Sequence, residues 1–357
     1  MSRFARYLGA SLVVASLVGC AGEERIGELE VRVLYPPGGV GDGSLADAIF
    51  SGVVAARSGT DFRVVESSPE SVADARATFE EWVATGGERV LIVLGTAGYT
   101  DFVLNRGCDF GASSVLLLDS EAPTCANLRS VRFDAYAPAY LAGVAAVSDP
   151  SLSPDQTAGI VAGADVPNIR ELIRAFTAGV ESAGGIVARI EFVSTLPEVG
   201  FADPARASEL TASMLAEVNV VYAAAGRSGE GVATRLEEHL GSSPASVVYF
   251  IGSDTDQATR HGDITVGSVL KRLDFAVRDA ILEMIGGRLS TGAVRVGFRD
   301  RWTEFLTHPR RGTAVLDGDC SGCSPFEPRC YRGCRTLDNV LEDARERAGQ
   351  AAESEDR

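Results

Sequence analysis

The chain has 357 residues, of which 45% are hydrophobic, and it carries a formal net charge of −16 at pH 7. This length and apolar content suffice for a large core, and the length favours two domains. Because nucleic-acid binding needs clustered Lys and Arg side chains, the net acidity argues against nucleic acid as a partner.

The first residues differ from the rest of the chain. Arg3 and Arg6 flank the start of an apolar stretch, YLGASLVVASLV, which has signal-peptide length and is too short to span a bilayer. It ends in Leu-Val-Gly-Cys, which resembles the lipobox of bacterial lipoproteins. We therefore predict a signal peptide over 1–19, a lipid on Cys20 and a polar tether over 20–27. An ordinary signal peptide with an incidental cysteine is the alternative.

Such a lipid would anchor the protein to the cell membrane, facing the periplasm or the cell exterior, where disulfides form. Cys108 and Cys125 flank a predicted strand, and we pair them. Four more cysteines crowd the tail in the pattern C-x2-C-x6-C-x3-C, for which we predict two disulfides. Zinc is the alternative, although the gap between the pairs is shorter than in a zinc ribbon. The tail cysteines are Cys320, Cys323, Cys330 and Cys334.

Strand and helix patterns alternate along the body of the chain. Continuous apolar strands with helices between them indicate parallel sheets covered on both faces, and their number indicates two α/β lobes. From about residue 313, a Cys-, Gly- and Pro-rich loop and a charged helix break the pattern. The predicted strands are 29–35, 89–95, 114–118, 158–163, 187–193, 219–225 and 246–252, and examples of the predicted helices are 69–86, 165–185 and 203–218.

Two Gly-rich segments follow predicted strands. The segment 41–52, GDGSLADAIFSG, holds Asp42 and Asp47 and opens a helix, which is typical of a ligand-presenting loop. The segment 223–232, AAAGRSGEGV, has the spacing G-x-x-G-x-G, which differs from the dinucleotide fingerprint. Its backbone N–H groups could meet a polar ligand, and a simple tight turn is the alternative.

Two later segments hold charged residues. GSDTDQ, at 252–257, ends a strand with Asp254 and Asp256, where carboxylates could accept hydrogen bonds from the vicinal hydroxyls of a sugar. An Asx turn is the alternative. In VGSVLKRLDFAV, at 266–277, we place Ser268 at the start of a helix and Lys271 one turn further, with a solvated surface lysine as the alternative.

Catalytic signatures are missing from the sequence. The histidines His239, His261 and His308 are scattered, and neither a G-x-S-x-G elbow nor a Walker loop is present. We therefore predict a protein that is not an enzyme and has neither a metal nor a cofactor. A hydrolase acting in the cleft is an alternative motivated only by Asp42 and Asp47.

Taken in order, the segments resemble the basic membrane protein family of substrate-binding lipoproteins, which includes purine nucleoside receptors of ABC importers. The resemblance runs from about residue 29 to 300. Its motifs are the loop from Asp42 to Asp47 with Gly52 in register, LLLD ending at Asp119, NLRSVRF at 127–133, AYLAG at 139–143, the turn and helix at 162–180, VGFADPARA at 199–207, the Gly-rich loop at 225–232, Asp254-Thr-Asp-Gln257, and Ser268 to Lys271.

The resemblance implies a type I periplasmic-binding fold, with two doubly wound parallel-sheet lobes, three crossovers and a ligand cleft that closes between the lobes. It implies that Phe201 stacks on a purine, Asp119 reads the base, and Asp254 or Asp256 binds ribose with Lys271. Gly226 would let the backbone approach the ligand, and Tyr99 would lie on the cleft wall. We assign 28–133 and 257–288 to the first lobe, 134–256 and 289–312 to the second, and 313–357 to the tail.

The departures from the family concentrate in the first loop. Leu45 replaces a stacking Phe, Asp47 replaces a Gln, and Gly43 and Ala46 replace a Lys and an Asn, while Asp42 and Ser44 keep the frame of the loop. Losing one ring of an aromatic sandwich forfeits roughly 0.5–1.5 kcal/mol beyond its buried area. Purine selectivity is therefore the part of the resemblance with least support in the residues.

The resemblance implies a solute-binding lipoprotein that binds a nucleoside or a related ribosyl or hydroxylated molecule and works with the permease and ATPase subunits of an ABC importer. The alternative is a sensor or structural surface lipoprotein on the same fold, with an altered or decayed pocket.

Overall fold

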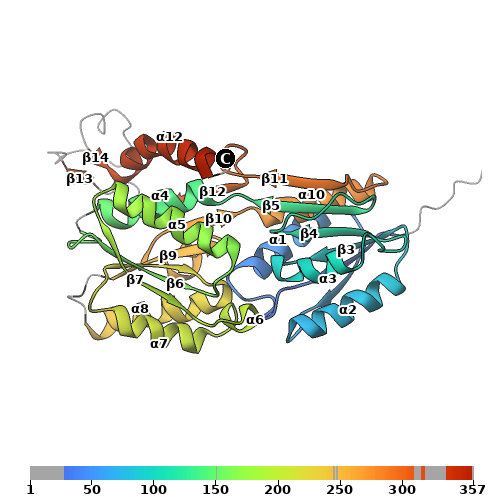
Figure 1. Cartoon of the computed structure of the whole chain (residues 1–357), viewed down its shortest axis with the longest axis horizontal. Coiled ribbons are helices and arrows are strands. Elements are labelled where there is room, and N and C mark those ends of the chain that lie inside the picture. Colours follow the sequence, from blue (N-terminus) through green and yellow to red (C-terminus); the bar gives the residue numbers. More distant parts are fainter. Residues whose placement is uncertain are drawn as a thin grey trace, which may run out of the picture.

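The computed structural model describes residues 28–149, 151–243, 246, 248–308, 315–317 and 335–355. The predictions for Cys20 and for the four tail cysteines lie outside these residues. The described chain forms two lobes side by side, each built on its own sheet (Figure 1). Among the described helices, none combines the length and the apolarity needed to cross a bilayer.

The first lobe holds a six-stranded sheet in the order β11-β5-β4-β3-β1-β2, and every pair in it is parallel. Apolar side chains of α1 and α10 pack on one face, and those of α2 and α3 pack on the other. The elements are β1 (Glu30–Leu34), α1 (Leu45–Arg57), β2 (Arg63–Ser67), α2 (Val72–Ala84), β3 (Val90–Leu94), η1 (Ala97–Tyr99), α3 (Thr100–Asn105), β4 (Ser114–Leu118), β5 (Leu128–Phe133), α10 (Leu273–Ile285) and β11 (Gly292–Val296).

The second lobe holds a six-stranded sheet in the order β12-β10-β9-β8-β6-β7, in which only β12 runs antiparallel to its neighbour. Helices α4 and α5 pack on one face, and α7 and α8 pack on the other. The elements are α4 (Tyr136–Ser148), β6 (Thr157–Ala162), α5 (Pro167–Ser182), β7 (Ile186–Phe192), α6 (Pro197–Gly200), α7 (Pro204–Met214), β8 (Val220–Ala224), η2 (Gly226–Ser228), α8 (Gly229–Ser242), β9 (Tyr249–Asp254), α9 (Ala258–His261), β10 (Thr265–Lys271) and β12 (Thr303–Thr307).

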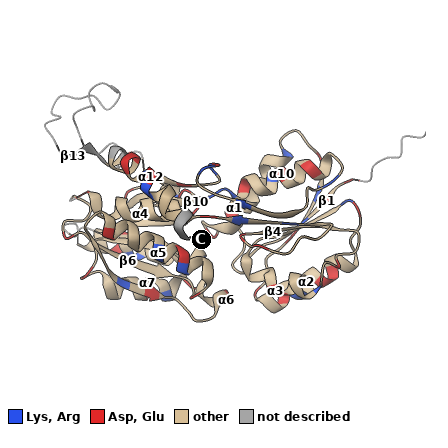
Figure 2. Cartoon of the chain, turned by 45° about the horizontal axis from the view of Figure 1, so that its top comes forward, with Lys and Arg blue, Asp and Glu red and all other residues tan. Residues whose placement is uncertain are grey.

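Further along the chain, β13 (Val315–Asp317) pairs with β14 (Arg335–Thr336), and α12 (Leu337–Glu355) packs on the α4 face of the second lobe. The predicted charged C-terminal helix is therefore confirmed. Charged residues of both signs are scattered over the helices of both lobes (Figure 2).

Three crossovers join the lobes: 134–135 after β5, Arg272 after β10, and 297–302 after β11. The predicted boundaries at 256/257 and 288/289 are wrong, because β10 lies in the second sheet and β11 lies in the first. The predicted helix start at Ser268 is also wrong. All seven residues of β10 are buried, since the strand pairs with β9 and β12, and the helix begins only at Leu273.

The other predicted elements agree with the structure. The seven predicted strands correspond to β1, β3, β4, β6, β7, β8 and β9, and the three predicted helices correspond to α2, α5 and α7. The predicted disulfide between Cys108 and Cys125 is present, with a Cα–Cα distance of 5.5 Å. Gly52 also has a physical reason, because a Cβ there would lie 2.6 Å from the backbone oxygen of Asp274 on α10.

Candidate functional site

A cavity of about 620 Å³ lies between the lobes, at the carboxyl ends of the parallel strands, where ligands bind in open α/β sheets. Nine of the eleven predicted ligand-binding residues line it. They are Asp42, Ser44, Leu45, Tyr99, Asp119, Phe201, Gly226, Asp254 and Lys271.

The polar end of the cavity is a buried cluster centred on Lys271, the last residue of β10. Its Nζ lies 2.8 Å from Oδ2 of Asp119 and 3.7 Å from Oδ1 of Asp254. Asp119 follows β4 in the first lobe and Asp254 ends β9 in the second, so the ammonium group bridges the lobes. Ser44 Oγ donates a 2.5 Å hydrogen bond to the other oxygen of Asp254.

Burial and charge act against each other in this cluster. Burial alone would lower the pKa of Lys271, but the carboxylates of Asp119 and Asp254 outweigh it, and the pKa is raised. Burial raises the pKa of Asp254 above its usual range, although Lys271 and the Ser44 hydroxyl oppose the shift. Lys271 therefore stays charged at neutral pH and stabilises two buried carboxylates.

Both carboxylates sit on unusual backbone. The φ angles of Asp119 and Asp254 are +54° and +68°, in the left-handed region that non-glycine residues seldom adopt. Such conformations cost of order 1–3 kcal/mol and cluster at binding sites. Each turns the chain sharply at the end of its strand, beside the cavity.

Asp42 holds the first loop in shape. Its carboxylate accepts hydrogen bonds from the backbone N–H groups of Ser44, Ala46 and Asp47 at 2.7, 3.1 and 3.2 Å, which caps the start of α1. Burial raises the pKa of Asp42 to about 6, even though these donors lower it. A carboxylate that lines the cavity thus also orders the loop that carries Ser44.

The structure places two predicted residues away from the cavity lining. Asp47 accepts hydrogen bonds from the N–H groups of Gly41 and Gly43 at 2.6 and 2.9 Å. Asp256 accepts one from the N–H of Ala258 at 3.0 Å, at the start of α9. Both carboxylates shape their own loops, and of the two first-loop carboxylates only Asp42 lines the cavity.

The walls of the cavity are largely apolar. Phe201 contributes one ring, and Leu45 lies where the resemblance places a second. A Cβ on Gly226, whose φ is +56°, would lie 3.3 Å from the backbone oxygen of Phe201 and 3.4 Å from its Cβ, so this glycine lets the two loops approach closely. Tyr99 is buried, and its hydroxyl donates a 2.6 Å hydrogen bond to the backbone oxygen of Tyr35.

Several lining residues were missed from the sequence. Asn168, at the start of α5, donates to Asp119 at 3.4 Å, and its position after the turn at 162–166 was the available signal. The remaining missed residues are mostly small or apolar, a composition that does not distinguish a pocket wall from a core. Examples are Pro36, Pro37, Val72, Pro167, Ile169, Leu172 and Pro197.

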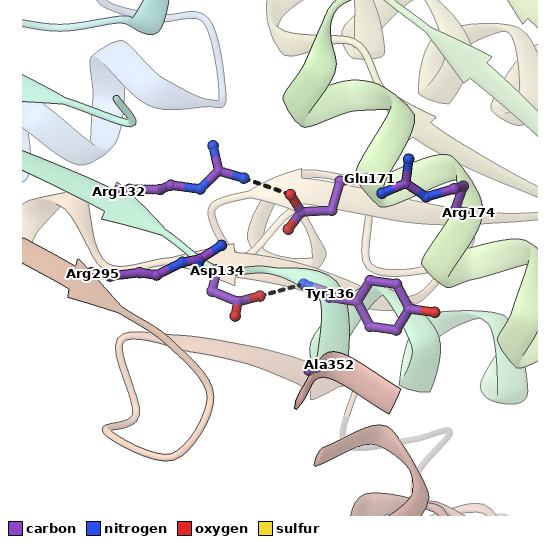
Figure 3. A pocket seen from close by; sticks show the side chains of 7 residues that line it. All are labelled: Arg132, Asp134, Tyr136, Glu171, Arg174, Arg295 and Ala352. Atoms are coloured by element: carbon purple, nitrogen blue, oxygen red, sulfur yellow. Dashed lines mark hydrogen bonds and ion pairs between the residues drawn. The ribbon is translucent and has the colours of Figure 1, made fainter. Parts of the chain in front are cut away.

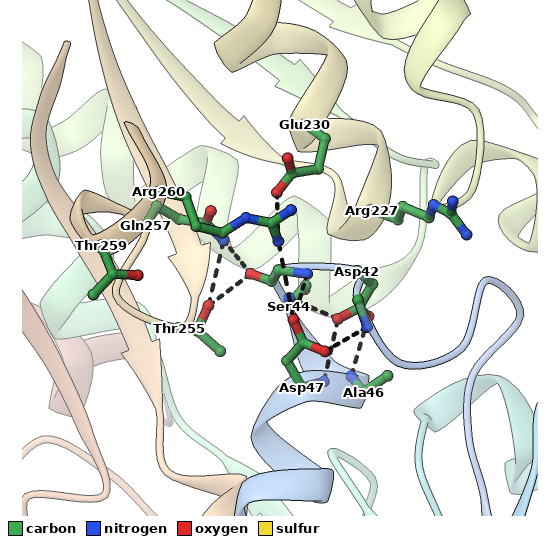
Figure 4. Close-up of polar contacts among 12 residues, drawn as sticks. Asp42, Ser44, Ala46, Asp47, Arg227, Glu230, Thr255, Gln257, Thr259 and Arg260 are labelled. Carbon is green, nitrogen blue, oxygen red and sulfur yellow. Dashed lines mark hydrogen bonds and ion pairs between the residues drawn. The ribbon is translucent and has the colours of Figure 1, made fainter. Parts of the chain in front are cut away.

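Polar contacts across the rim hold the lobes together (Figure 4). The backbone oxygen of Gly43 in the first lobe accepts hydrogen bonds from the Thr255 hydroxyl, at 2.6 Å, and from the Gln257 amide of the second lobe. Arg227 donates to the backbone oxygen of Gly38 at 2.9 Å. With the Ser44–Asp254 bond, these contacts fasten the first-lobe loop to the segments at the ends of β8 and β9.

A charged network borders this rim and carries a prediction for pH. His261 lies between Glu237 and Glu230, at 2.9 and 3.3 Å, and Glu230 also pairs with Arg260 at 3.0 Å. The hydrogen bond to Glu230 raises the pKa of His261; partial burial opposes the shift and Glu237 adds to it. The resulting stability is present below the unfolded-state pKa of about 6.5 and is lost as pH rises through the folded-state pKa.

We therefore expect His261→Gln to lower the free energy of unfolding at pH 6 by roughly 1 kcal/mol. The difference from wild type should shrink as pH is raised above the folded-state pKa. Denaturant unfolding between pH 5.5 and 9 measures it, with His239→Gln on α8 as the control. A difference that stays constant over this range would contradict the assigned network.

The chain is similar to known proteins in both sequence and fold. A sequence profile of PnrA-like ABC transporter substrate-binding proteins, the Bmp family, matches residues 30–308. Among curated proteins, none matches the chain in sequence. A solute-binding protein of an ABC transporter system from Aeropyrum pernix K1 superimposes with a TM-score of 0.71 at 23% identity, covering 91% of this chain and 90% of that one.

A solute-binding protein of an ABC transporter system from Conexibacter woesei gives a TM-score of 0.59 at 14% identity, with 90% of this chain and 97% of that one covered. A transcriptional activator of the comK gene from Bacillus halodurans gives 0.60 at 18% identity, with 89% and 96% covered. At these identities the likenesses show the fold, and they confirm the type I periplasmic-binding architecture. The profile match extends over most of the chain, and the chain therefore belongs to the Bmp family of PnrA-like ABC transporter substrate-binding proteins.

Proposed function

We propose that this protein is a lipid-anchored receptor that captures a nucleoside or a related ribosyl or hydroxylated molecule in the inter-lobe cavity and delivers it to an ABC permease. Membership of the family supports the general part of this proposal: a small-molecule ligand, an ABC transporter as the partner, and a location outside the cytoplasm. The observation that supports the finer part is the buried cluster of Asp119, Lys271, Asp254 and Ser44 beneath apolar walls.

The chemistry of the cluster suits hydroxyl groups. Each carboxylate can accept two hydrogen bonds from vicinal hydroxyls, while Lys271 donates but accepts nothing. In this structure Ser44 donates a hydrogen bond to one oxygen of Asp254. A ribose or polyol seated here would exchange such protein contacts for ligand contacts, which links ligand capture to the contacts between the lobes.

The charge of the cavity narrows the ligand class. Five carboxylates line it, against two cationic side chains, Arg227 and Lys271. Lys271 is already paired with carboxylates. A ligand that carries a phosphate would meet net negative charge, so we expect nucleosides and uncharged or cationic polyols to bind in preference to nucleotides and sugar phosphates.

Equilibrium binding to matched compounds tests the proposal. The purified protein is unfolded, refolded free of ligand, checked for its native fold, and titrated calorimetrically with nucleosides, the corresponding nucleotides, free bases and sugars. We expect at least one ribosyl or polyol compound to bind and its phosphorylated counterpart to bind at least tenfold more weakly. Folded, ligand-free protein that binds none of the ribosyl or polyol compounds would refute this ligand class.

Leu45→Phe tests the assigned wall of the cavity. If a planar base lies against Phe201, a second ring at this position should sandwich the base. We then expect nucleoside affinity to rise by about 0.5–1.5 kcal/mol, which is roughly two- to twelvefold. The affinity for a polyol without a ring should stay the same. Leu45→Ile is the control, because it keeps the apolar character and adds no ring.

The anchor rests on the sequence of the N-terminus. Nine residues lie between Cys20 and Glu30, the first residue of β1, and a fully extended chain would cover these ten Cα-to-Cα steps in about 35 Å. A chain of this length would hold the folded lobes close to the membrane. Mass spectrometry of the native N-terminal peptide tests it: we expect a lipid-modified Cys20, and Cys20→Ser should release the protein from the membrane fraction.

A further inference from the structure

A second cavity, of about 230 Å³, lies at the junction of the two lobes and apart from the ligand cavity (Figure 3). Its lining comes from both lobes, because β5 and β11 belong to the first sheet while α4 and α5 pack on the second. The residues are Arg132, Asp134, Tyr136, Glu171, Arg174, Arg295 and Ala352.

Three guanidinium groups meet in this small space. Those of Arg132 and Arg295 come from the first lobe, and that of Arg174 faces them from α5 across the cavity (Figure 3). Arg132 donates through Nη2 to Glu171 at 2.5 Å, which pairs the lobes directly. A guanidinium has five N–H donors, so a group that already forms one ion pair can still bind a second anion.

The C-terminal helix reaches the same cavity. Helix α12 lies beyond the residues matched by the family profile, and it packs on the second lobe through Leu337, Leu341 and Ala344. Ala352, near its end, lines the cavity. The sequence continues after Ala352 with three acidic residues among the next four, Glu353, Glu355 and Asp356.

We infer that this cavity is a binding site for an oxyanion, a carboxylate or a phosphate, held by arginines of both lobes. The described lining carries three guanidinium groups and two carboxylates, and arginine forks match planar or tetrahedral oxyanions. The oxyanion has two available sources: a free dianion such as phosphate, or the acidic end of the chain itself. Either one would join Arg132 and Arg295 to Arg174 and so stabilise the arrangement of the lobes seen here.

Thermal unfolding of the full chain tests the site without any knowledge of the transported ligand. Phosphate is titrated against chloride at matched ionic strength, for wild type and for Arg174→Gln, an exposed position where the substitution should not disturb folding. A second variant, Glu353→Gln/Glu355→Gln/Asp356→Asn, neutralises the acidic end. Arg206→Gln, an exposed arginine of α7, is the matched control.

If a free dianion is the occupant, phosphate should raise the unfolding temperature of wild type by about 2 °C or more, with saturation. Arg174→Gln should abolish this rise, and Arg206→Gln should keep it. If the acidic end is the occupant, wild type should not respond, and the neutralised variant should unfold about 2 °C lower in chloride and recover in phosphate. The site would be overturned if phosphate changed the unfolding temperatures of Arg174→Gln and Arg206→Gln equally, both with the acidic end intact and with it neutralised. Only the general stabilising effect of phosphate would then remain.

Discussion

Replacing Lys271 with methionine is expected to lower the free energy of unfolding by about 3–5 kcal/mol at pH 7, because it leaves buried carboxylates without their cation. The side chain of Lys271 is only 6% exposed, and its ammonium group lies 2.8 Å from Asp119. Asp254, at 3.7 Å, would keep the Ser44 hydroxyl and lose the nearest positive charge. Methionine has a similar length, so the loss would come from charge rather than from a cavity.

The stability that Lys271→Met loses should also depend on pH in a characteristic direction. In wild type, the raised pKa of Lys271 keeps the pair intact until strongly alkaline pH, so this residue adds no slope between pH 5 and 8. In Lys271→Met, the deficit should shrink as pH falls from 7 to 5, because the orphaned carboxylates take up protons. Denaturant unfolding at several pH values measures this deficit.

A double variant provides the control. Lys271→Met/Asp119→Asn removes the cation together with its closest carboxylate, so we expect it to be more stable than Lys271→Met alone by 1 kcal/mol or more. A Lys271→Met protein that loses less than about 1 kcal/mol at pH 7 would show that the pair contributes little, as exposed ion pairs do. The same variants report on ligand capture, since the cluster is the proposed hydroxyl-binding end of the cavity.

The fold could be predicted from the sequence for those strands that are buried on both faces of their sheet. Strands such as β3, with all five residues buried, read as continuous apolar runs, and parallel sheets follow from them. Edge strands β2 and β11 are partly exposed. Because they mix polar and apolar residues, they lack the continuous apolar run that identifies a buried strand. The error at β10 has another source: an apolar run that continues into α10 fits a helix or a strand equally well, and only the neighbouring strands decide.

The sequence could predict most of the residues that line the candidate site, but not the contacts that each of them makes. The order of the motifs predicted that Asp119, Asp254 and Lys271 lie in one site, although more than 100 residues separate Asp119 from Asp254. The sequence could not show which carboxylates face the cavity and which accept backbone N–H groups. Asp47 and Asp256 are chemically equivalent to Asp119, and only the folded loops distinguish their partners.

Gly143→Ala is expected to cost about 3 kcal/mol or more, although it adds a single methyl group. A Cβ on Gly143 would lie 2.1 Å from the backbone oxygen of Phe176, and one on Gly179 would lie 2.0 Å from that of Tyr140. Helices α4 and α5 therefore approach through paired glycines, where rigid backbone opposes any added atom. Overpacking of this kind usually costs 1–3 kcal/mol, and contacts with backbone that cannot move fall at the upper end of the range or beyond it.

A glycine-to-alanine substitution at an open position of another helix should have the opposite effect on stability. Gly241→Ala, in α8, meets no atom within 4 Å, so the better helix propensity of alanine should make it neutral or stabilising by up to about 1 kcal/mol. Urea unfolding of both variants separates the two effects, and equal stabilities would contradict the close helix contact. Because α4 follows the first crossover and α5 carries Asn168 into the ligand cavity, a Gly143→Ala protein that still folds should also bind its ligand more weakly. The AYLAG motif would then be a packing requirement that positions one wall of the site.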